Sequence, residues 1–220
     1  MVKLIKTVLS IDVCIRCPRD YQTGPVFTTL FNDCYGKCYI CEHIPIPPVV
    51  EHLIAHKGNE EIKYDWNNLF LACVHCNKVK EKREYDDGIL NPTKVDPEDY
   101  IEFCLVVDNF KEKVVIRNIC ETKEMILVEK TIKLLDMIYN NSSARDNQKV
   151  SSIQLKNMLS KNVRDFCLLL ENYKEERDIG SYNNINDEIS RKSEFAAFKR
   201  YIIRRDPVLK TEFENTLKDC

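Results

Sequence analysis

Hydrophobic and polar positions divide the chain into a loop-rich first part and a helix-rich second part. In residues 1–97 the apolar runs are short, as in Leu69–Ala72, and 11 of the 13 Gly and Pro residues of the chain lie there. Gly and Pro interrupt regular structure, so this part is expected to contain short strands joined by loops. Beyond residue 97 only Gly180 and Pro207 remain, which favours helices.

The second part contains five segments with a recognisable pattern. Residues 97–105 start with Pro and predict a short helix, because Pro suits the first helical turn. Residues 114–119 alternate weakly and predict a strand. Apolar residues at helical spacing predict three longer helices, over 122–140, 151–177 and 186–206.

Composition places the chain among ordinary globular proteins. Its 220 residues suffice for one large domain or two small ones, and the charged and hydrophobic fractions, 31% and 44%, are typical. Residues 7–15 are too short and too interrupted by Asp12 for a signal peptide. No apolar run approaches the roughly 20 residues of a membrane span. A cytoplasmic location is therefore expected.

The net charge of −2 is spread evenly along the chain. Residues 1–95 hold 12 basic and 12 acidic side chains, and residues 96–220 hold 21 and 23. Proteins that bind nucleic acid non-specifically neutralise many phosphates with clustered cations. Any such binding must rest here on local patches or on a partner that supplies the positive charge.

Eleven cysteines without a secretory signal indicate metal binding rather than disulfides. Two Cys-x-x-Cys pairs stand 31 residues apart, a spacing that fits one tetrahedral zinc ion. The expected ligands are Cys38, Cys41, Cys73 and Cys76. A third pair, Cys14 and Cys17, lacks an obvious partner pair, although Cys34 could contribute to a second metal site.

The segment between the zinc pairs carries a second pattern. Glu51 and His52 are followed 16 residues after the His by Asn68, and then by Cys-x-x-Cys-Asn-x-x-Lys at 73–80. In this order and spacing the chain resembles the HNH endonucleases. The resemblance implies a ββα-metal core, in which two strands and a helix surround one divalent cation, braced by a four-cysteine zinc.

The same resemblance assigns roles to individual residues. His52 would be the general base, since a neutral imidazole accepts a proton near pH 7. Glu51 and Asn77 would bind the catalytic Mg²⁺ or Mn²⁺ through oxygen, and Asn68, on the second strand, would hold the His52 loop. A helix beyond the second knuckle would present four cations to the phosphates of DNA: Lys78, Lys80, Lys82 and Arg83.

Three other histidines are candidates for the base. His43 follows Glu42, but this pair is fused to the first zinc knuckle and His43 stands 25 residues before Asn68. His75 lies inside the second knuckle, where it is expected to pack. His56 stands four residues beyond His52 and could touch substrate. Spacing therefore favours His52.

A looser likeness extends beyond the motif, through "ILNPTKVDPEDYIEF" and the tail sequence "EFAAFKRYI". It is similar to PtuB, the HNH effector family of Septu-type and retron-associated antiphage systems, which implies an SMC/ABC-like ATPase partner of the PtuA type. The expected fold is α+β. Its expected parts are an arm over 1–26, a zinc-stabilised HNH core over 27–95, and a helical domain over 96–220 for packing or partner docking.

Two alternatives remain open for the function. One is a stand-alone restriction-type HNH nuclease, and the other is a zinc-stabilised nucleic-acid-binding or protein-binding module without catalysis. Within the tail, one face of 194–204 carries aromatic residues beside cations: Phe195, Phe198 and Ile202 beside Lys199, Arg200 and Arg204. That face is either intramolecular core or a docking surface, because Arg-ringed aromatic residues also form interface hot spots.

Overall fold

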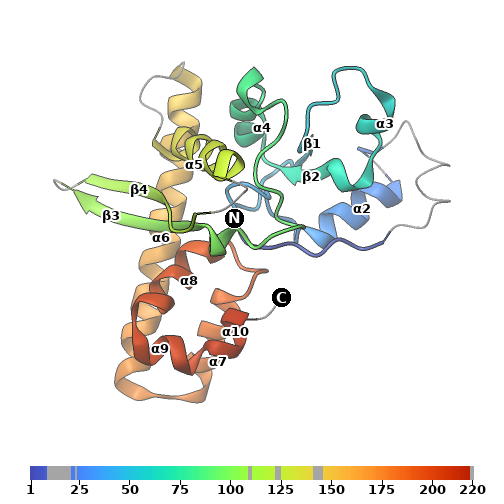
Figure 1. The fold of residues 1–220 in the computed structure, drawn as a ribbon. Coiled ribbons are helices and arrows are strands. Elements are labelled where there is room, and N and C mark those ends of the chain that lie inside the picture. Colours follow the sequence, from blue (N-terminus) through green and yellow to red (C-terminus); the bar gives the residue numbers. More distant parts are fainter. Residues whose placement is uncertain (9–20, 23, 109–110, 122–124, 141–145, 219–220) are drawn as a thin grey trace.

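Two antiparallel strand pairs and a series of helices make up the described part of the chain (Figure 1). The computed structural model describes residues 1–8, 21–22, 24–108, 111–121, 125–140 and 146–218. The first part holds α2 (Gly24–Asp33), β1 (Val49–His52), α3 (Glu60–Lys63), β2 (Leu69–Ala72) and α4 (Val74–Lys80). Short 3-10 turns lie at η1 (Trp66–Asn68), η2 (Arg83–Tyr85) and η3 (Pro97–Asp99).

The second part holds the other strand pair and the longer helices. They are β3 (Ile101–Asp108), β4 (Lys111–Asn118), α5 (Met125–Asn140), α6 (Asp146–Glu176), α7 (Ile179–Ile189), α8 (Ala196–Arg205), α9 (Pro207–Glu212) and α10 (Glu214–Lys218). This is the expected α+β fold, with a four-cysteine cluster and a mostly helical C-terminal region. Within the described ranges, no helix has the length and apolar character needed to span a bilayer.

β1, β2 and α4 form a ββα unit. β1 and β2 are antiparallel, with Glu51 opposite Phe70 and His52 opposite Leu69. Every residue of β2 is buried, as its uninterrupted apolar sequence requires. α4 begins at the second knuckle, where the Cys73 side chain caps it by accepting a hydrogen bond from the Cys76 amide.

Residues 1–8 reinforce this unit from the side. The Lys6 ammonium donates to the Leu69 carbonyl at 2.7 Å and lies 3.9 Å from the centroid of the Trp66 ring. The Trp66 indole donates to the Thr7 carbonyl at 2.9 Å. These contacts hold the turn that leads into β2. The third cysteine pair, Cys14 and Cys17, lies outside the described residues.

The hairpin of β3 and β4 corrects the helix expected over 97–105. Only Pro97–Asp99 turns, as η3, and the chain then extends as β3. Ile101 and Phe103 alternate with less buried neighbours and face the core, while β4 pairs with the full length of β3. Pairing with the following strand overrides the helix signal here. The strand expected over 114–119 is confirmed within β4.

Two apolar clusters meet along α6. The larger cluster joins the ββα unit to β3, β4, α5, the N-terminal half of α6 and the first turns of α8. The smaller one joins Phe166, Leu170 and Tyr173 of α6 to α7, α9 and α10. The helices expected over 122–140 and 151–177 are confirmed as α5 and α6. α6 contributes residues to both clusters and so connects them (Figure 1).

The helix expected over 186–206 is broken by residues 190–195. α7 ends at Ile189 and α8 starts at Ala196, after Phe195 adopts a left-handed conformation with φ of 53°. The break exposes carbonyls of Arg191 and Ser193 to Lys37, whose buried ammonium donates to both, at 2.5 and 2.8 Å. The tail therefore clamps the first zinc knuckle, a contact between residues about 155 positions apart that sequence spacing cannot reveal.

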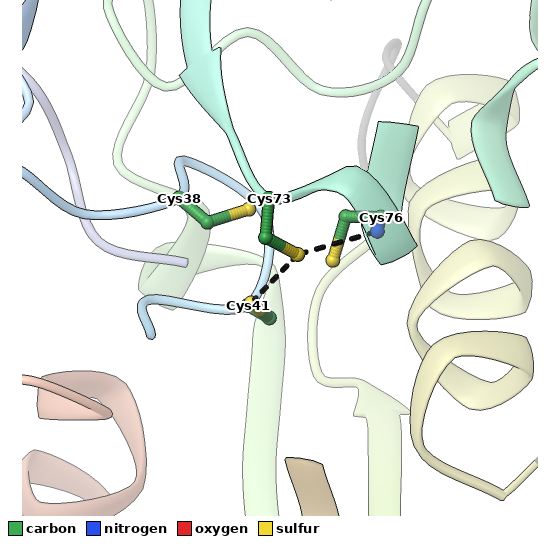
Figure 2. A group of neighbouring side chains, drawn as sticks. All are labelled: Cys38, Cys41, Cys73 and Cys76. Atoms are coloured by element: carbon green, nitrogen blue, oxygen red, sulfur yellow. Dashed lines mark hydrogen bonds between the residues drawn. The ribbon is translucent and has the colours of Figure 1, made fainter. Parts of the chain in front are cut away.

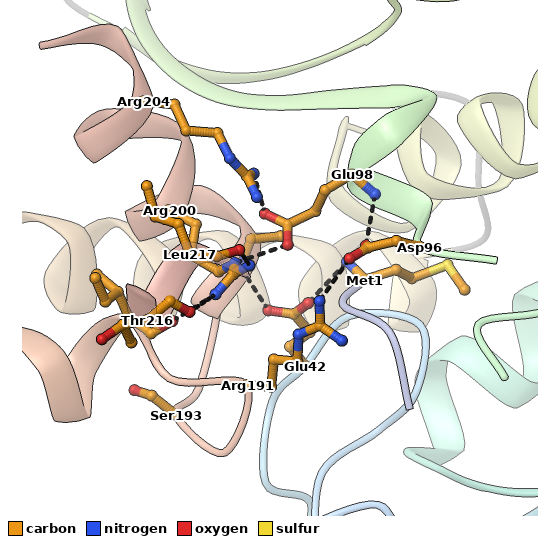
Figure 3. Close-up of polar contacts among 12 residues, drawn as sticks. Met1, Glu42, Asp96, Glu98, Arg191, Ser193, Arg200, Arg204, Thr216 and Leu217 are labelled. Atoms are coloured by element: carbon orange, nitrogen blue, oxygen red, sulfur yellow. Dashed lines mark hydrogen bonds and ion pairs between the residues drawn. The ribbon is translucent and has the colours of Figure 1, made fainter. Parts of the chain in front are cut away.

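Figure 3 shows the buried charges behind this clamp. Arg200 and Arg204 both pair with Glu98, and Arg200 also donates to the carbonyls of Thr216 and Leu217. Arg191 pairs with Asp96 at 2.6 Å. Phe195, Phe198, Lys199 and Arg200 are buried inside the molecule. These four side chains are therefore intramolecular core and are not free for docking, whereas Ile202 and Arg204 of the same face are half-buried.

Candidate metal centre and active site

Four thiols converge at the junction of the knuckle and α4 (Figure 2). The Sγ atoms of Cys38, Cys41, Cys73 and Cys76 all lie within 4.8 Å of one another, and all four residues are buried. Cys41 Sγ and Cys73 Sγ are 3.9 Å apart. A disulfide requires about 2.05 Å, whereas tetrahedral zinc with bonds of about 2.3 Å separates its sulfurs by about 3.8 Å. The spacing fits zinc.

The chemistry of the donor set agrees with the spacing. Burial raises the pKa of the Cys76 thiol, because a thiolate is poorly solvated in the core. A bound cation offsets that cost and deprotonates the thiols. Thiolates select zinc over the hard cations that prefer oxygen. The four-cysteine cluster therefore indicates a structural zinc.

The knuckles are tied to the helices by hydrogen bonds from aromatic side chains. The Tyr139 hydroxyl of α5 donates to the Cys41 carbonyl at 3.0 Å. His75 Nε2 donates to the Ile138 carbonyl at 3.1 Å and lies 3.3 Å from the Ser152 hydroxyl of α6. His75 thus packs against the helices, away from β1.

A cleft of about 400 Å³ opens beside β1 and α4. Glu51, His52, His56, Asn77 and Lys80 all contribute to its wall. The structure therefore brings three of the four expected active-site residues to one cavity. The fourth, Asn68, is buried behind it.

The imidazole of His52 is held from three sides. Its Nε2 donates to the Lys63 carbonyl at 2.9 Å, which leaves the lone pair on Nδ1 in the neutral ring. The Tyr21 ring meets it edge-on with centroids 5.3 Å apart, and the His56 ring lies at 4.9 Å. Burial lowers the pKa of His52 below its ordinary value; the hydrogen bond to the Lys63 carbonyl opposes this shift, while His56 and Lys80 add to it. The lowered pKa favours the neutral ring and the hydrogen bond orients it, as a general base requires.

Asn68 cross-links the loop that carries this carbonyl. Its Oδ1 accepts from the Ile54 amide at 2.7 Å, and its Nδ2 donates to the carbonyls of Ile54 and Ile62 at 2.9 and 3.0 Å. Ile62 precedes Lys63, whose carbonyl orients His52. Asn68 lies at the end of η1 rather than on β2 as expected, because the chain turns once more before the strand begins.

Glu51 is more enclosed than a solvated strand residue. Its side chain is 6% exposed, Oε1 accepts from the Lys80 ammonium at 2.7 Å, and Oε2 accepts from the Tyr39 hydroxyl at 2.7 Å. Burial raises the pKa of the Glu51 carboxyl, although both of these donors act in the opposite direction. Tyr39 lies within the first knuckle and stacks on Phe70.

The expected row of cations does not share one helix face. α4 ends at Lys80, and Lys82 and Arg83 follow in the turn and η2. Lys78, Lys82 and Arg83 are exposed, but Lys80 is buried against Glu51. Lys80 stands three residues after Asn77 and therefore lines the same cleft. Its expected contact with a DNA phosphate stays a prediction.

The competing pair, Glu42 and His43, makes contacts outside the cleft of His52. Glu42 pairs with the amine of Met1 at 2.9 Å and accepts from the Ala197 amide at 3.0 Å. His43 Nδ1 lies 2.8 Å from a Glu194 carboxylate oxygen. Both side chains therefore attach the first knuckle to the tail, and neither lines the cleft of His52. This geometry favours His52 over His43 as the base.

Sequence reasoning missed Tyr39, Tyr21 and the Lys63 carbonyl. Tyr39 sits between two zinc ligands, where a buried hydroxyl could have been suspected from the "CYIC" knuckle alone. Tyr21 and Lys63 reach His52 only through the fold, across 31 and 11 positions. The role of the Lys63 carbonyl could not be predicted from the sequence, because every residue type has a backbone carbonyl.

Comparison with known proteins gives one finding for the family. Residues 38–83 match the model of the HNH endonuclease family, so these residues form an HNH domain. The matched range begins at Cys38 and ends after α4, and it contains both knuckles and the whole cleft motif. It supports a metal-dependent nuclease in general, with nucleic acid as substrate. No curated protein matches the chain.

Loss of one zinc ligand should destabilise the whole protein. Cys73→Ser removes a thiolate and weakens the N-cap of α4, so we expect a lower melting temperature and less than one zinc per chain by elemental analysis. Cys120→Ser is the matched control, because Cys120 is exposed and far from the cluster in sequence. The zinc assignment would be contradicted if elemental analysis found no zinc in the purified wild-type protein. It would also be contradicted if Cys73→Ser had the same melting temperature as Cys120→Ser.

Proposed function

We propose that the protein is a metal-dependent endonuclease that hydrolyses phosphodiester bonds of DNA at the cleft of Glu51, His52 and Asn77. The observation that carries this proposal is the orientation of His52, whose Nε2 is bound to the Lys63 carbonyl while the ring borders the cleft. Its Nδ1 is then the atom that removes a proton from an attacking water. A module that only binds nucleic acid has no need of a base fixed in this way.

The other residues divide the remaining tasks. Glu51 and Asn77 supply a carboxylate and an amide oxygen to the same cleft, a donor set that suits Mg²⁺ or Mn²⁺. Such a cation, when bound, takes up the charge that develops on the phosphate and the leaving oxygen. Asn68 keeps the loop of Ile54, Ile62 and Lys63 in place. Lys78, Lys82 and Arg83 would bind phosphates of the flanking backbone.

We further propose that the nuclease acts in antiphage defence together with an ATPase partner. This proposal rests on the likeness to PtuB and on the even charge of the chain, which offers little attraction to DNA outside the local patch near α4. A Septu-type ATPase would then deliver or restrain the nuclease. Because Phe195, Phe198, Lys199 and Arg200 are buried, such a partner would have to bind other side chains.

His52→Ala should reduce cleavage of plasmid DNA by about 10²–10⁴-fold, the usual contribution of general base catalysis. The loss should appear in Mg²⁺ and in Mn²⁺, and EDTA should abolish wild-type cleavage. The matched control is His43→Ala, which leaves the cleft intact and should retain activity. RNA of the same sequence is tested in parallel to define the substrate. An active His52→Ala enzyme, or an inactive wild type in both metals, would contradict the assignment.

Co-purification tests the partner separately. The full chain, tagged and co-expressed with an ATPase of the PtuA type from the same genome, should retain that ATPase through size-exclusion chromatography. A tagged variant that lacks a nuclease motif residue, Asn77→Ala, should retain it equally, since Asn77 lies in the cleft. If the nuclease elutes alone while it cleaves DNA unaided, a stand-alone restriction-type enzyme is the better description.

A further inference from the structure

Lys80 places a fixed positive charge inside the cleft. Its ammonium donates to Glu51 Oε1 at 2.7 Å and to the His52 carbonyl at 2.8 Å, and its side chain is 4% exposed. Tyr39 donates to the other oxygen of Glu51. Both carboxylate oxygens of Glu51 therefore already have a buried donor. The motif resemblance assigns this ammonium to a phosphate of DNA, whereas the structure pairs it with Glu51.

A divalent cation on Glu51 and the ammonium of Lys80 cannot both keep this arrangement. A metal–oxygen bond of about 2.1 Å to Oε1 would bring the ion within a few ångström of the ammonium. Like charges at that distance repel strongly where little water screens them. The Tyr39 hydroxyl, in contrast, is neutral and can keep its bond. Lys80 is thus the group that must move.

We propose that Lys80 is a built-in cation that occupies Glu51 until a divalent ion displaces it, and that the displaced ammonium then binds a phosphate of the substrate. The inference rests on the proposed function, which assigns Glu51 to the divalent cation. The long, flexible stem of Lys80 lets its ammonium leave Glu51 and stay within the cleft. The released charge then lies beside His52, where the scissile phosphate must approach.

This arrangement couples metal binding to substrate binding. The metal releases the ammonium that the phosphate needs, and the phosphate holds the ammonium away from the carboxylate that the metal needs. By linkage, each ligand raises the affinity of the other by the same factor. Without nucleic acid, Lys80 keeps the metal site weak. A lysine with only a structural role predicts the reverse, since its removal would disorder Glu51 and weaken metal binding.

Removing the Lys80 charge should raise the affinity for the metal if Lys80 competes with it, and should lower that affinity if Lys80 has only a structural role. Mn²⁺ binding to the full-length, zinc-containing protein is measured without nucleic acid, from the electron paramagnetic resonance signal of the free ion. Lys80→Gln keeps an N–H donor for the His52 carbonyl but removes the charge. We expect it to bind Mn²⁺ about tenfold more tightly than wild type, within the 5–150-fold range typical of coupling between two ligands.

Two further variants make the comparison specific. Lys78→Gln, on the same helix but exposed, should bind Mn²⁺ as wild type does. Glu51→Gln should lose the site. If Lys80→Gln binds Mn²⁺ no more tightly than wild type while Glu51→Gln loses the site, the inference fails and the metal site stands. If none of the proteins has a Glu51-dependent Mn²⁺ site, the proposed function fails together with the inference.

A second measurement avoids any change at Lys80, in case Lys80→Gln does not fold. His52→Ala protein, which should cleave DNA about 10²–10⁴-fold more slowly than wild type, is titrated with Mn²⁺ with and without a short DNA duplex. The duplex should tighten the Glu51-dependent site at least about fivefold, the lower end of typical coupling. The double variant Glu51→Gln/His52→Ala corrects for Mn²⁺ on the DNA itself. Equal affinities with and without DNA would overturn the proposal.

Discussion

The four thiols of Cys38, Cys41, Cys73 and Cys76 determine where every other part of the site can lie. They join the loop before β1 to the helix after β2, so β1, β2 and α4 cannot separate while the zinc ion is held. Tyr39, between two of the ligands, is thereby placed on Glu51, and α4 is started at the position that points Asn77 and Lys80 into the cleft. A small unit with two four-residue strands has little core of its own, and metal ligation supplies stability that burial alone does not.

The remainder of the chain supports the knuckle from outside. Lys37, Glu42 and His43 bind the segment 191–197, and Tyr139 of α5 binds the Cys41 carbonyl. These contacts desolvate charged groups, which costs free energy unless each one is paired. Here the pairing partners come from the tail, so the tail and the HNH domain depend on each other. The aromatic residues Phe195 and Phe198 are accordingly part of the intramolecular core.

Motif spacing predicted the knuckles, the adjacent Glu51 and His52, and the position of Asn77, because each of these is a local constraint on residue type. Helical periodicity likewise predicted α5 and α6. Two of the features that were not predicted involve contacts over long distances in sequence: Lys37 binds carbonyls in the break of the last helix, and Lys80 is buried against Glu51. The third is local, because β3 and β4 pair as a hairpin and this pairing overrides the helix signal of residues 97–105.

We propose that the protein holds two chemically different metal sites, a sulfur site that stabilises the domain and an oxygen site in the cleft. Anomalous diffraction from a crystal of the His52→Ala protein with Mn²⁺ and a DNA duplex would locate both ions. We expect a zinc peak among the four cysteine sulfurs and a separate manganese peak bound by Glu51 and Asn77, with the Lys80 ammonium moved onto a phosphate. A manganese peak elsewhere, or an intact pair between Glu51 and Lys80 beside bound DNA, would contradict this proposal.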